Sequence, residues 1–206
     1  MTSKKVVITG SRGIAEGIAR ALSNERVYLI GGEEEDSKAL ASELTQIVGY
    51  SPIDLRIETA VEDSFVKADA AMGGITDVIG IVGGSGRSFG DGPIDKISKS
   101  AWEATLDLNL STAFLTAREA IRHIGENGSI TLTSSVLAVS PSPKYFQTHA
   151  YAVSKVAING LVTALSAAYI DKNIRVNAVA PSLVATPMAA RAATNPEIIE
   201  FTKEKM

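Results

Sequence analysis

The chain has 206 residues, of which 45% are hydrophobic and 21% charged, so it can bury one sizeable core and is not a disordered chain. Its net charge of −3 gives no general attraction for nucleic acid. The chain has no Cys and only two His, which excludes a disulfide scaffold and makes a multi-histidine metal centre improbable. The longest charge-free apolar stretch, between Lys155 and Asp171, is shorter than the about 20 residues of a membrane span. We therefore expect a cytoplasmic protein with no metal, no nucleic-acid partner and no membrane partner.

Apolar runs of strand length alternate with helix-periodic segments along the whole chain. We expect strands at Lys5–Thr9, Val27–Ile30, Gly49–Asp54, Asp77–Val82, Ser129–Thr133 and Arg175–Ala180. Helices are expected at Gly13–Asn24, Ser37–Val48, Val61–Met72, Ser100–His123 and Ala150–Lys172. This alternation predicts an α/β fold in which a six-stranded, doubly wound parallel sheet of the Rossmann type forms one domain over residues 1–206.

A glycine-rich turn follows the first expected strand and opens the first expected helix. It reads Gly10-Ser11-Arg12-Gly13-Ile14, and its glycines let the backbone approach a pyrophosphate. The exposed N–H groups and the positive end of the helix dipole would hold the phosphate charge. The order strand, turn, helix favours dinucleotide binding, with a plain tight turn as the alternative.

Acidic side chains follow the second and third expected strands. Glu33 lies 20 residues after Gly13, where a carboxylate can accept hydrogen bonds from the ribose hydroxyls of NAD. The alternative is that the acidic run beginning at Glu33 stabilises the start of the next helix. Asp54, followed by Leu55, could meet the adenine ring or simply end its strand in a turn. Because the acidic run repels the 2′-phosphate of NADP while Arg12 could bind it, we expect NAD or NADP, with NAD slightly favoured.

Tyr151 and Lys155 lie four residues apart at the start of the last expected helix. This spacing places the phenol and the ammonium on one helix face. The ordinary pKa of tyrosine is about 10, and a neighbouring cation lowers it, as a general acid/base near neutrality requires. The pair taken alone is also typical of a solvated helix face.

Further residues accompany this pair in a fixed order along nearly the whole chain. They are Thr9-Gly10 with Gly13, Asp54, Asn109 within Leu106–Asn109, Ser135, and the segment Ile174–Pro181. With Tyr151 and Lys155 they resemble the short-chain dehydrogenase/reductase family, and in particular its 3-oxoacyl-[acyl-carrier-protein] reductase-like members. The resemblance implies an oxidoreductase that transfers a hydride between NAD(P)(H) and an alcohol/carbonyl substrate.

The resemblance also implies roles for individual side chains. Tyr151 exchanges the proton, Lys155 lowers the Tyr151 pKa and bonds the nicotinamide ribose, Ser135 donates to the carbonyl oxygen, and Asn109 holds a water that links Lys155 to solvent. Strand alternation faces Ser134 away if Ser135 faces the cofactor. The resemblance places the following residues at the cofactor: Gly83, Gly84, Pro181, Val184 and, at the nicotinamide carboxamide, Thr186.

The sequence departs from the family pattern at several positions. The glycine turn is one residue shorter than usual, and Gly83-Gly84-Ser85-Gly86 replaces the usual Asn-Asn-Ala-Gly. The family's seventh strand is missing from these 206 residues, so either the chain is truncated at Met206 or the sheet ends at six strands, with residues 187–206 expected as a partial substrate lid. These departures keep open an alternative function, a non-catalytic NAD(P)-binding sensor or scaffold on the same fold.

The expected helices 100–123 and 150–172 are longer than the cover of one sheet requires. Apolar residues recur on more than one of their faces: Phe114, Ala117, Ile158, Leu161 and Leu165. In the family these two helices pair across a two-fold axis. We therefore expect a homodimer or homotetramer through them, with the dimer favoured.

Overall fold

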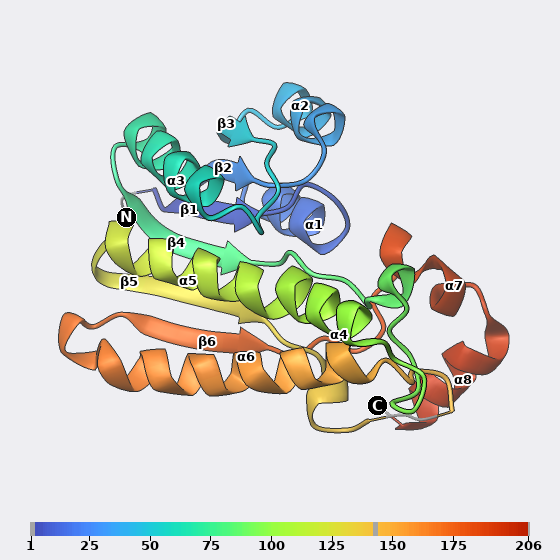
Figure 1. Cartoon of the computed structure of the whole chain (residues 1–206). Coiled ribbons are helices and arrows are strands. Elements are labelled where there is room, and N and C mark those ends of the chain that lie inside the picture. Colours follow the sequence, from blue (N-terminus) through green and yellow to red (C-terminus); the bar gives the residue numbers. More distant parts are fainter. Residues whose placement is uncertain (1–2, 142–143, 206) are drawn as a thin grey trace.

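In the computed structural model, which describes residues 3–141 and 144–205, helices cover both faces of a parallel sheet (Figure 1). The strands are β1 Lys5–Thr9, β2 Arg26–Ile30, β3 Ile47–Ser51, β4 Ile75–Gly80, β5 Ile124–Thr133 and β6 Arg175–Val179. Their spatial order is β3-β2-β1-β4-β5-β6, and every neighbouring pair is parallel. The order reverses between β1 and β4, where folds of this kind bind ligands at the carboxyl ends of the strands. The predicted six-stranded, Rossmann-type sheet is confirmed.

Eight α-helices connect and flank the strands within the described residues. They are α1 Ile14–Ala21, α2 Glu34–Glu43, α3 Glu58–Met72, α4 Lys99–Leu106, α5 Thr112–His123, α6 His149–Ala168, α7 Ala190–Ala193 and α8 Pro196–Lys205. α1 and α2 lie on one face of the sheet, while α3, α5 and α6 lie on the other (Figure 1). α7 and α8 lie beyond the carboxyl ends of the strands.

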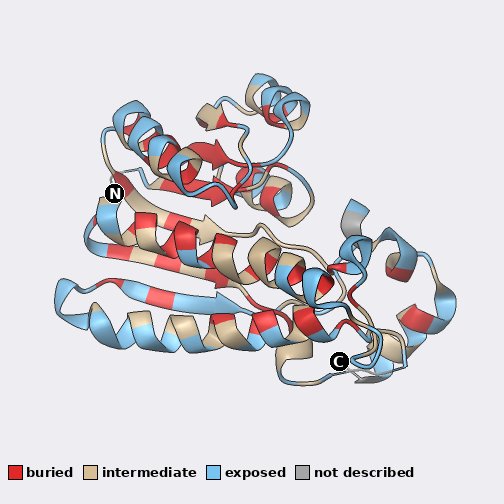
Figure 2. Cartoon of the chain, viewed as in Figure 1, coloured by how far each residue is buried: buried red, intermediate tan, exposed pale blue. Residues whose placement is uncertain are grey.

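The core follows the period-two alternation of the strands. In β1, Val6 and Ile8 pack toward α1 and α2, whereas Val7 packs toward α3, α5 and α6. Figure 2 shows the buried residues gathered in the central strands and on the helix faces turned toward them. The edge strand β6 is different, because Val176 is its one buried residue.

Several element boundaries differ from the prediction around β3. The second helix begins at Glu34 rather than Ser37, since the acidic run favours the first turn of a helix. It ends at Glu43 because Ile47 belongs to the core beneath α1 and α2 and starts β3. β3 then ends at Ser51, since Pro52 has no N–H for the ladder. β4 likewise begins and ends two residues earlier than predicted.

The helix expected at 100–123 contains a break in its α-helical pattern. A π-helical turn at Asp107–Ser111 separates α4 from α5, and the three together form one continuous helical segment. The turn contains Asn109, whose side chain is completely buried. π turns of this kind occur frequently at functional sites, and the hydrophobic pattern of the sequence does not reveal this one.

Candidate active site

Two cavities open at the carboxyl ends of the strands and share one side chain. The first, about 500 Å³, lies between the turn that follows β1 and the start of α6. The second, about 280 Å³, lies beside Ser135 and the segments that follow β6. Tyr151 lines both cavities and is the one described residue that they share.

The predicted phosphate-binding turn lines the first cavity. Gly10 and Gly13 have φ values of 95° and 60°, which other residues rarely adopt. A Cβ on Gly13 would lie 3.1 Å from the Thr186 methyl carbon, so a side chain at this position would crowd Thr186, which also lines the cavity. Arg12 and Ile14 also line the cavity, whereas the Ser11 hydroxyl is buried against Gly32 and faces away from it.

The acidic residues that the sequence predicts at the adenosine lie outside the lining of the first cavity. Glu33 is the exposed N-cap residue of α2, and Asp36 in the first turn forms an ion pair with Arg12 at 3.5 Å. Asp54 forms a 2.6 Å ion pair with Arg56, whose hydrogen bonds lower the pKa of the Asp54 carboxyl. None of these acidic residues lines the first cavity. A role for them at the cofactor stays a prediction.

Leu55, which follows Asp54, is 3% exposed and serves as core. Its side chain packs against Gly31, where a Cβ would lie 2.7 Å from a Leu55 methyl carbon. This contact supports the turn after β2. The predicted contact of Leu55 with the cofactor is not supported by this buried position.

Asn109 holds the loop that follows β4. Its Nδ2 donates to the Gly84 carbonyl at 2.9 Å and to the Thr105 carbonyl at 2.9 Å, and its Oδ1 accepts from the Gly84 N–H at 3.0 Å. A Cβ on Gly83 would lie 2.6 Å from Asn109 Oδ1 and 3.3 Å from Lys155 Nζ. The glycines in this loop therefore permit the close packing of Asn109 and Lys155. The water-holding role of Asn109 stays a prediction.

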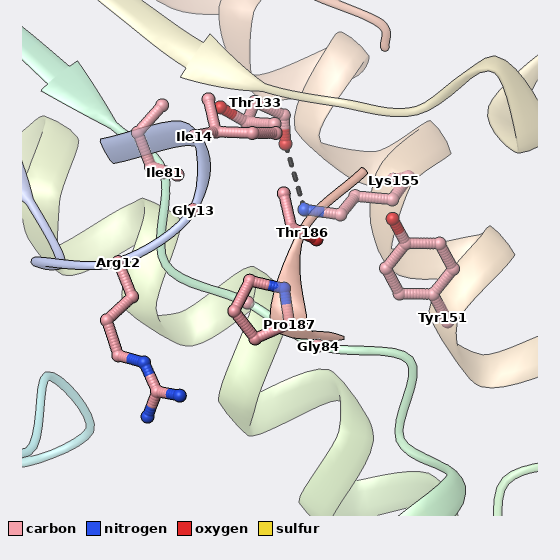
Figure 3. Close-up of a pocket in the computed structure, with 11 residues that line it drawn as sticks. Arg12, Gly13, Ile14, Ile81, Gly84, Thr133, Tyr151, Lys155, Thr186 and Pro187 are labelled. Atoms are coloured by element: carbon pink, nitrogen blue, oxygen red, sulfur yellow. Dashed lines mark hydrogen bonds between the residues drawn. The ribbon is translucent and has the colours of Figure 1, made fainter. Parts of the chain in front are cut away.

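Lys155 points into the first cavity from α6 (Figure 3). Its Nζ donates to the Thr133 carbonyl at the end of β5 at 2.9 Å and lies 5.5 Å from the centroid of the Tyr151 ring. Burial without a carboxylate partner lowers the pKa of Lys155 to about 8. The i,i+4 spacing thus brings the phenol and the amine together, as predicted.

The pKa of Tyr151 differs from the expectation. Burial of the phenol raises this pKa, and a hydrogen bond from Ser135 offsets only part of the rise. The expected net lowering is not found, because desolvation of the phenol outweighs the hydrogen bond from Ser135. The phenol is therefore protonated at neutral pH. A lowering of this pKa by Lys155 stays a prediction.

The two adjacent serines after β5 have different surroundings. The Ser135 hydroxyl accepts from the Leu137 N–H at 3.2 Å, which leaves its proton for the Tyr151 oxygen. Ser134 is 1% exposed and donates to the Lys155 carbonyl at 3.1 Å, so it faces α6. Ser135 is the serine that lines the second cavity with Tyr151.

Comparison with known proteins agrees with this arrangement. Residues 8–206 match the family described as enoyl-(acyl carrier protein) reductase. Glucose 1-dehydrogenase from Gluconobacter oxydans is 34% identical over 94% of this chain and 74% of its own length. 3-Oxoacyl-[acyl-carrier-protein] reductase FabG from Chlamydia muridarum is 30% identical over 91% of this chain and 77% of its own length. A Burkholderia cenocepacia short-chain dehydrogenase solved with NADP is 26% identical, with a TM-score of 0.84 over 96% of this chain and 80% of that one.

The chain belongs to the short-chain dehydrogenase/reductase family. It is an oxidoreductase that uses NAD or NADP to interconvert alcohol and carbonyl groups of small molecules. The relatives give no support to a non-catalytic sensor on this fold.

One residue that supports the site of this short-chain dehydrogenase/reductase is not predicted by any pattern in the sequence. The Asp91 carboxylate accepts from the N–H groups of Ala150 at 3.1 Å and Tyr151 at 2.9 Å. It thereby replaces the N-cap side chain of α6, since Thr148 makes no capping hydrogen bond. Asp91 is 59 residues away from Ala150 in the sequence, and no local capping signal connects them.

The segment after β6 supplies the remaining predicted residues. Thr186 lines the first cavity, and its hydroxyl accepts from the Ala189 N–H at 3.3 Å. Pro181 lines the second cavity, and its carbonyl accepts from the Val136 N–H at 3.1 Å. Val184 is 40% exposed and lines neither cavity, so the predicted contact between its side chain and the cofactor is not supported by its position.

Proposed function

We propose that Tyr151 is the general acid/base of this oxidoreductase and that Ser135 and Lys155 act with it. The observation that carries the proposal is the position of Tyr151, which lines both cavities and is hydrogen-bonded to Ser135. The first cavity fits a dinucleotide, because it opens at the carboxyl ends of the strands and Gly13, Gly83 and Gly84 in its lining let the backbone approach a ligand closely. A bound NAD(P)(H) would supply or accept the hydride there.

The chain's own residues account for the proton and the charge. Reduction of a carbonyl places negative charge on its oxygen, and the hydroxyls of Ser135 and Tyr151 both line the cavity in which that oxygen would lie. Tyr151 gives up its phenolic proton to this oxygen, and in the oxidation direction it takes the proton back. The cationic form of Lys155 favours the phenolate that remains.

Asn109 and the glycine turns position these groups. Arg12, Gly13, Ile14, Gly83, Gly84 and Thr186 line the first cavity and would hold the dinucleotide. The overall proposal is tested by mixing the protein with NADH or NADPH and a panel of aldehydes and ketones, and by following the absorbance of the reduced nicotinamide. Binding of the dinucleotide without oxidation in the presence of any carbonyl would contradict it.

We further propose that NAD is preferred to NADP. Arg12 at the rim of the first cavity is the group that would attract a 2′-phosphate, but its guanidinium is already paired with Asp36. We expect the wild type to bind NADH more tightly than NADPH, and Asp36→Ala to shift the ratio of dissociation constants toward NADPH by about threefold to tenfold. Fluorescence titration of both nucleotides measures this ratio.

Asp63→Ala, which removes an exposed carboxylate from α3, is the matched control and should leave the ratio unchanged. A wild-type preference for NADPH would show that Arg12 binds the 2′-phosphate in spite of Asp36.

For assembly, we propose a homodimer through α5 and α6. Of the five apolar residues expected on outer faces, Ala117 and Ile158 are instead buried, and Leu161 and Leu165 pack against the core. The outer face is formed by Phe114, Val153 and Val156, which are 47%, 46% and 50% exposed.

The length and composition of α6 would also allow it to span a membrane. However, α6 packs on β6 and carries Tyr151 and Lys155, so a second copy of the chain is the better cover for its outer face. The same reasoning supports a cytoplasmic location.

Light scattering at micromolar concentration should give twice the chain mass of 21.6 kDa. Val156→Asp should give the monomer, because a buried unpaired carboxylate disfavours association. Val66→Asp, on the exposed face of α3, should remain dimeric. A monomeric wild type would refute this interface, and a mass four times that of the chain would require a second one.

A further inference from the structure

Two arginine side chains reach the second cavity from distant parts of the chain. Arg87 begins a single 3-10 turn after Gly86, in the connection between β4 and α4, and Arg191 belongs to α7. Both line the cavity that Ser135 and Tyr151 also line. The rest of the lining is mainly apolar and includes Leu137 and Phe146.

The two guanidinium groups converge on one point. Arg87 Nη2 donates to the Tyr145 carbonyl oxygen at 3.3 Å, and Arg191 Nη2 donates to the same oxygen at 3.4 Å. One carbonyl oxygen uses a small part of the ten N–H donors that two guanidinium groups carry. The remaining donors are available to a ligand in the cavity.

No carboxylate neutralises this pair within residues 3–141 and 144–205. Every arginine or lysine ion pair of the described residues involves other side chains. Asp91 attracts Arg87, but both of its carboxylate oxygens already accept from the first turn of α6. Glu197 accepts from the Tyr145 hydroxyl at 3.4 Å.

The electrostatics at Arg87 reflect the absence of an ion pair to either guanidinium group among the described residues. Burial and the positive charge of Arg191 lower the pKa of Arg87, with Asp91 opposing them in part. Like charges placed together raise the free energy of the folded protein, and an anion bound between them lowers it. Paired arginines are the side chains best suited to a planar carboxylate or a phosphate, since they donate in parallel pairs.

We propose that the substrate of this enzyme is an anionic carbonyl compound whose carboxylate or phosphate group is bound by Arg87 and Arg191. The inference rests on the proposed roles of Tyr151 and Ser135, because these place the reacting carbonyl at one side of the cavity and leave the arginines for a second group. The volume of about 280 Å³ suits a small molecule with a short apolar link between the two groups.

The full-length protein with its preferred nicotinamide nucleotide allows a direct test. Acetoacetate is compared with its methyl ester, and dihydroxyacetone phosphate with dihydroxyacetone, so that each pair differs in the anionic group. We expect kcat/KM to be at least about tenfold higher for the anionic member of one pair. The pair that shows the difference distinguishes a carboxylate from a phosphate. Equal rates within both pairs would overturn the proposal.

Arg87→Gln and Arg191→Gln provide the second test. Each should lower kcat/KM for the anion by about tenfold, mainly through KM, and leave the rate with the neutral partner and the affinity for the nucleotide within about threefold. Arg175→Gln removes the same charge at the amino end of β6 and serves as the control. Equal losses for anionic and neutral substrates would assign the arginines a purely structural role.

Calorimetric titration separates this inference from the proposed catalytic roles. Acetoacetate and inorganic phosphate are titrated into the wild type and into the double variant Arg87→Gln/Arg191→Gln. Binding that only the wild type shows supports the anion site even if Tyr151→Phe keeps its turnover, and the proposed function alone would then fail. Equal binding by both proteins, or by neither, would overturn the anion site.

Discussion

Replacing Tyr151 by Phe should lower turnover by at least about 100-fold, the contribution expected of a positioned acid/base. The change removes one hydroxyl and keeps the ring that separates the two cavities. Because burial raises the pKa of Tyr151, the wild-type phenol is protonated at neutral pH and ready to act as the acid in carbonyl reduction. The dissociation constant of the nucleotide should change by no more than about twofold.

Steady-state rates and nucleotide titration measure the two effects separately. Tyr169→Phe is the matched control, since Tyr169 follows α6 at the end remote from the cavities, and it should retain full turnover. Turnover of Tyr151→Phe within a few-fold of the wild type would refute the assignment. Loss of nucleotide binding together with turnover would indicate a damaged fold.

Lys155→Met should abolish most turnover and at the same time raise the free energy of unfolding. The pKa of Lys155 falls from an ordinary value of 10.5 to about 8 on folding. This change corresponds to about 3 kcal/mol of destabilisation when the amine is charged. Methionine avoids that cost, but it leaves the Thr133 carbonyl without its hydrogen-bond donor. The lost hydrogen bond offsets about 1 kcal/mol of the gain in stability. A net gain of about 2 kcal/mol is expected at neutral pH.

The pH dependence gives the effect a distinctive form. Below pH 8 both the folded and the unfolded chain bind the Lys155 proton, so the cost is complete and the variant has its full advantage. Between pH 8 and 10.5 only the unfolded chain keeps the proton, and wild-type stability rises relative to the variant. Above pH 10.5 the cost is gone, and the missing hydrogen bond to Thr133 should leave the variant about 1 kcal/mol less stable than the wild type.

Urea unfolding at several pH values measures this profile. Lys172→Met, on the exposed 3-10 turn after α6, should leave stability unchanged over the whole range. A variant less stable than the wild type at pH 7, or an advantage independent of pH, would contradict the buried-charge explanation.

The sequence predicts the order of strands and helices because each buried strand is a short apolar run and each crossover has helical periodicity. It also predicts that Tyr151 and Lys155 lie together, because their spacing within one helix determines their relative position. The predicted helix end near β3 is wrong, because an apolar Ile47 fits both a helix and a strand. Only its burial beneath α1 in the folded chain shows that it belongs to the strand β3.

Residues that act through contacts with distant parts of the chain cannot be predicted from local sequence patterns. Asp91 looks like an ordinary loop carboxylate until the fold brings it to the start of α6. Arg87 and Arg191 carry no motif, and only the shared Tyr145 carbonyl reveals that they converge. The pKa of Tyr151 was misjudged for a related reason, since desolvation depends on every element that surrounds the phenol.

The π-helical turn at Asp107–Ser111 makes this part of the chain unusually sensitive to deletions. Such a turn accommodates one extra residue within an otherwise continuous helix. Removing one residue would restore regular α-helical hydrogen bonding and keep α4 and α5 in register, but it would close the wide turn that carries Asn109. Asn109 would then leave Gly84, and the glycine loop beside Lys155 would lose its anchor. During evolution, substitutions in this turn are therefore tolerated more readily than a one-residue deletion, even though the deletion would give a more regular helix.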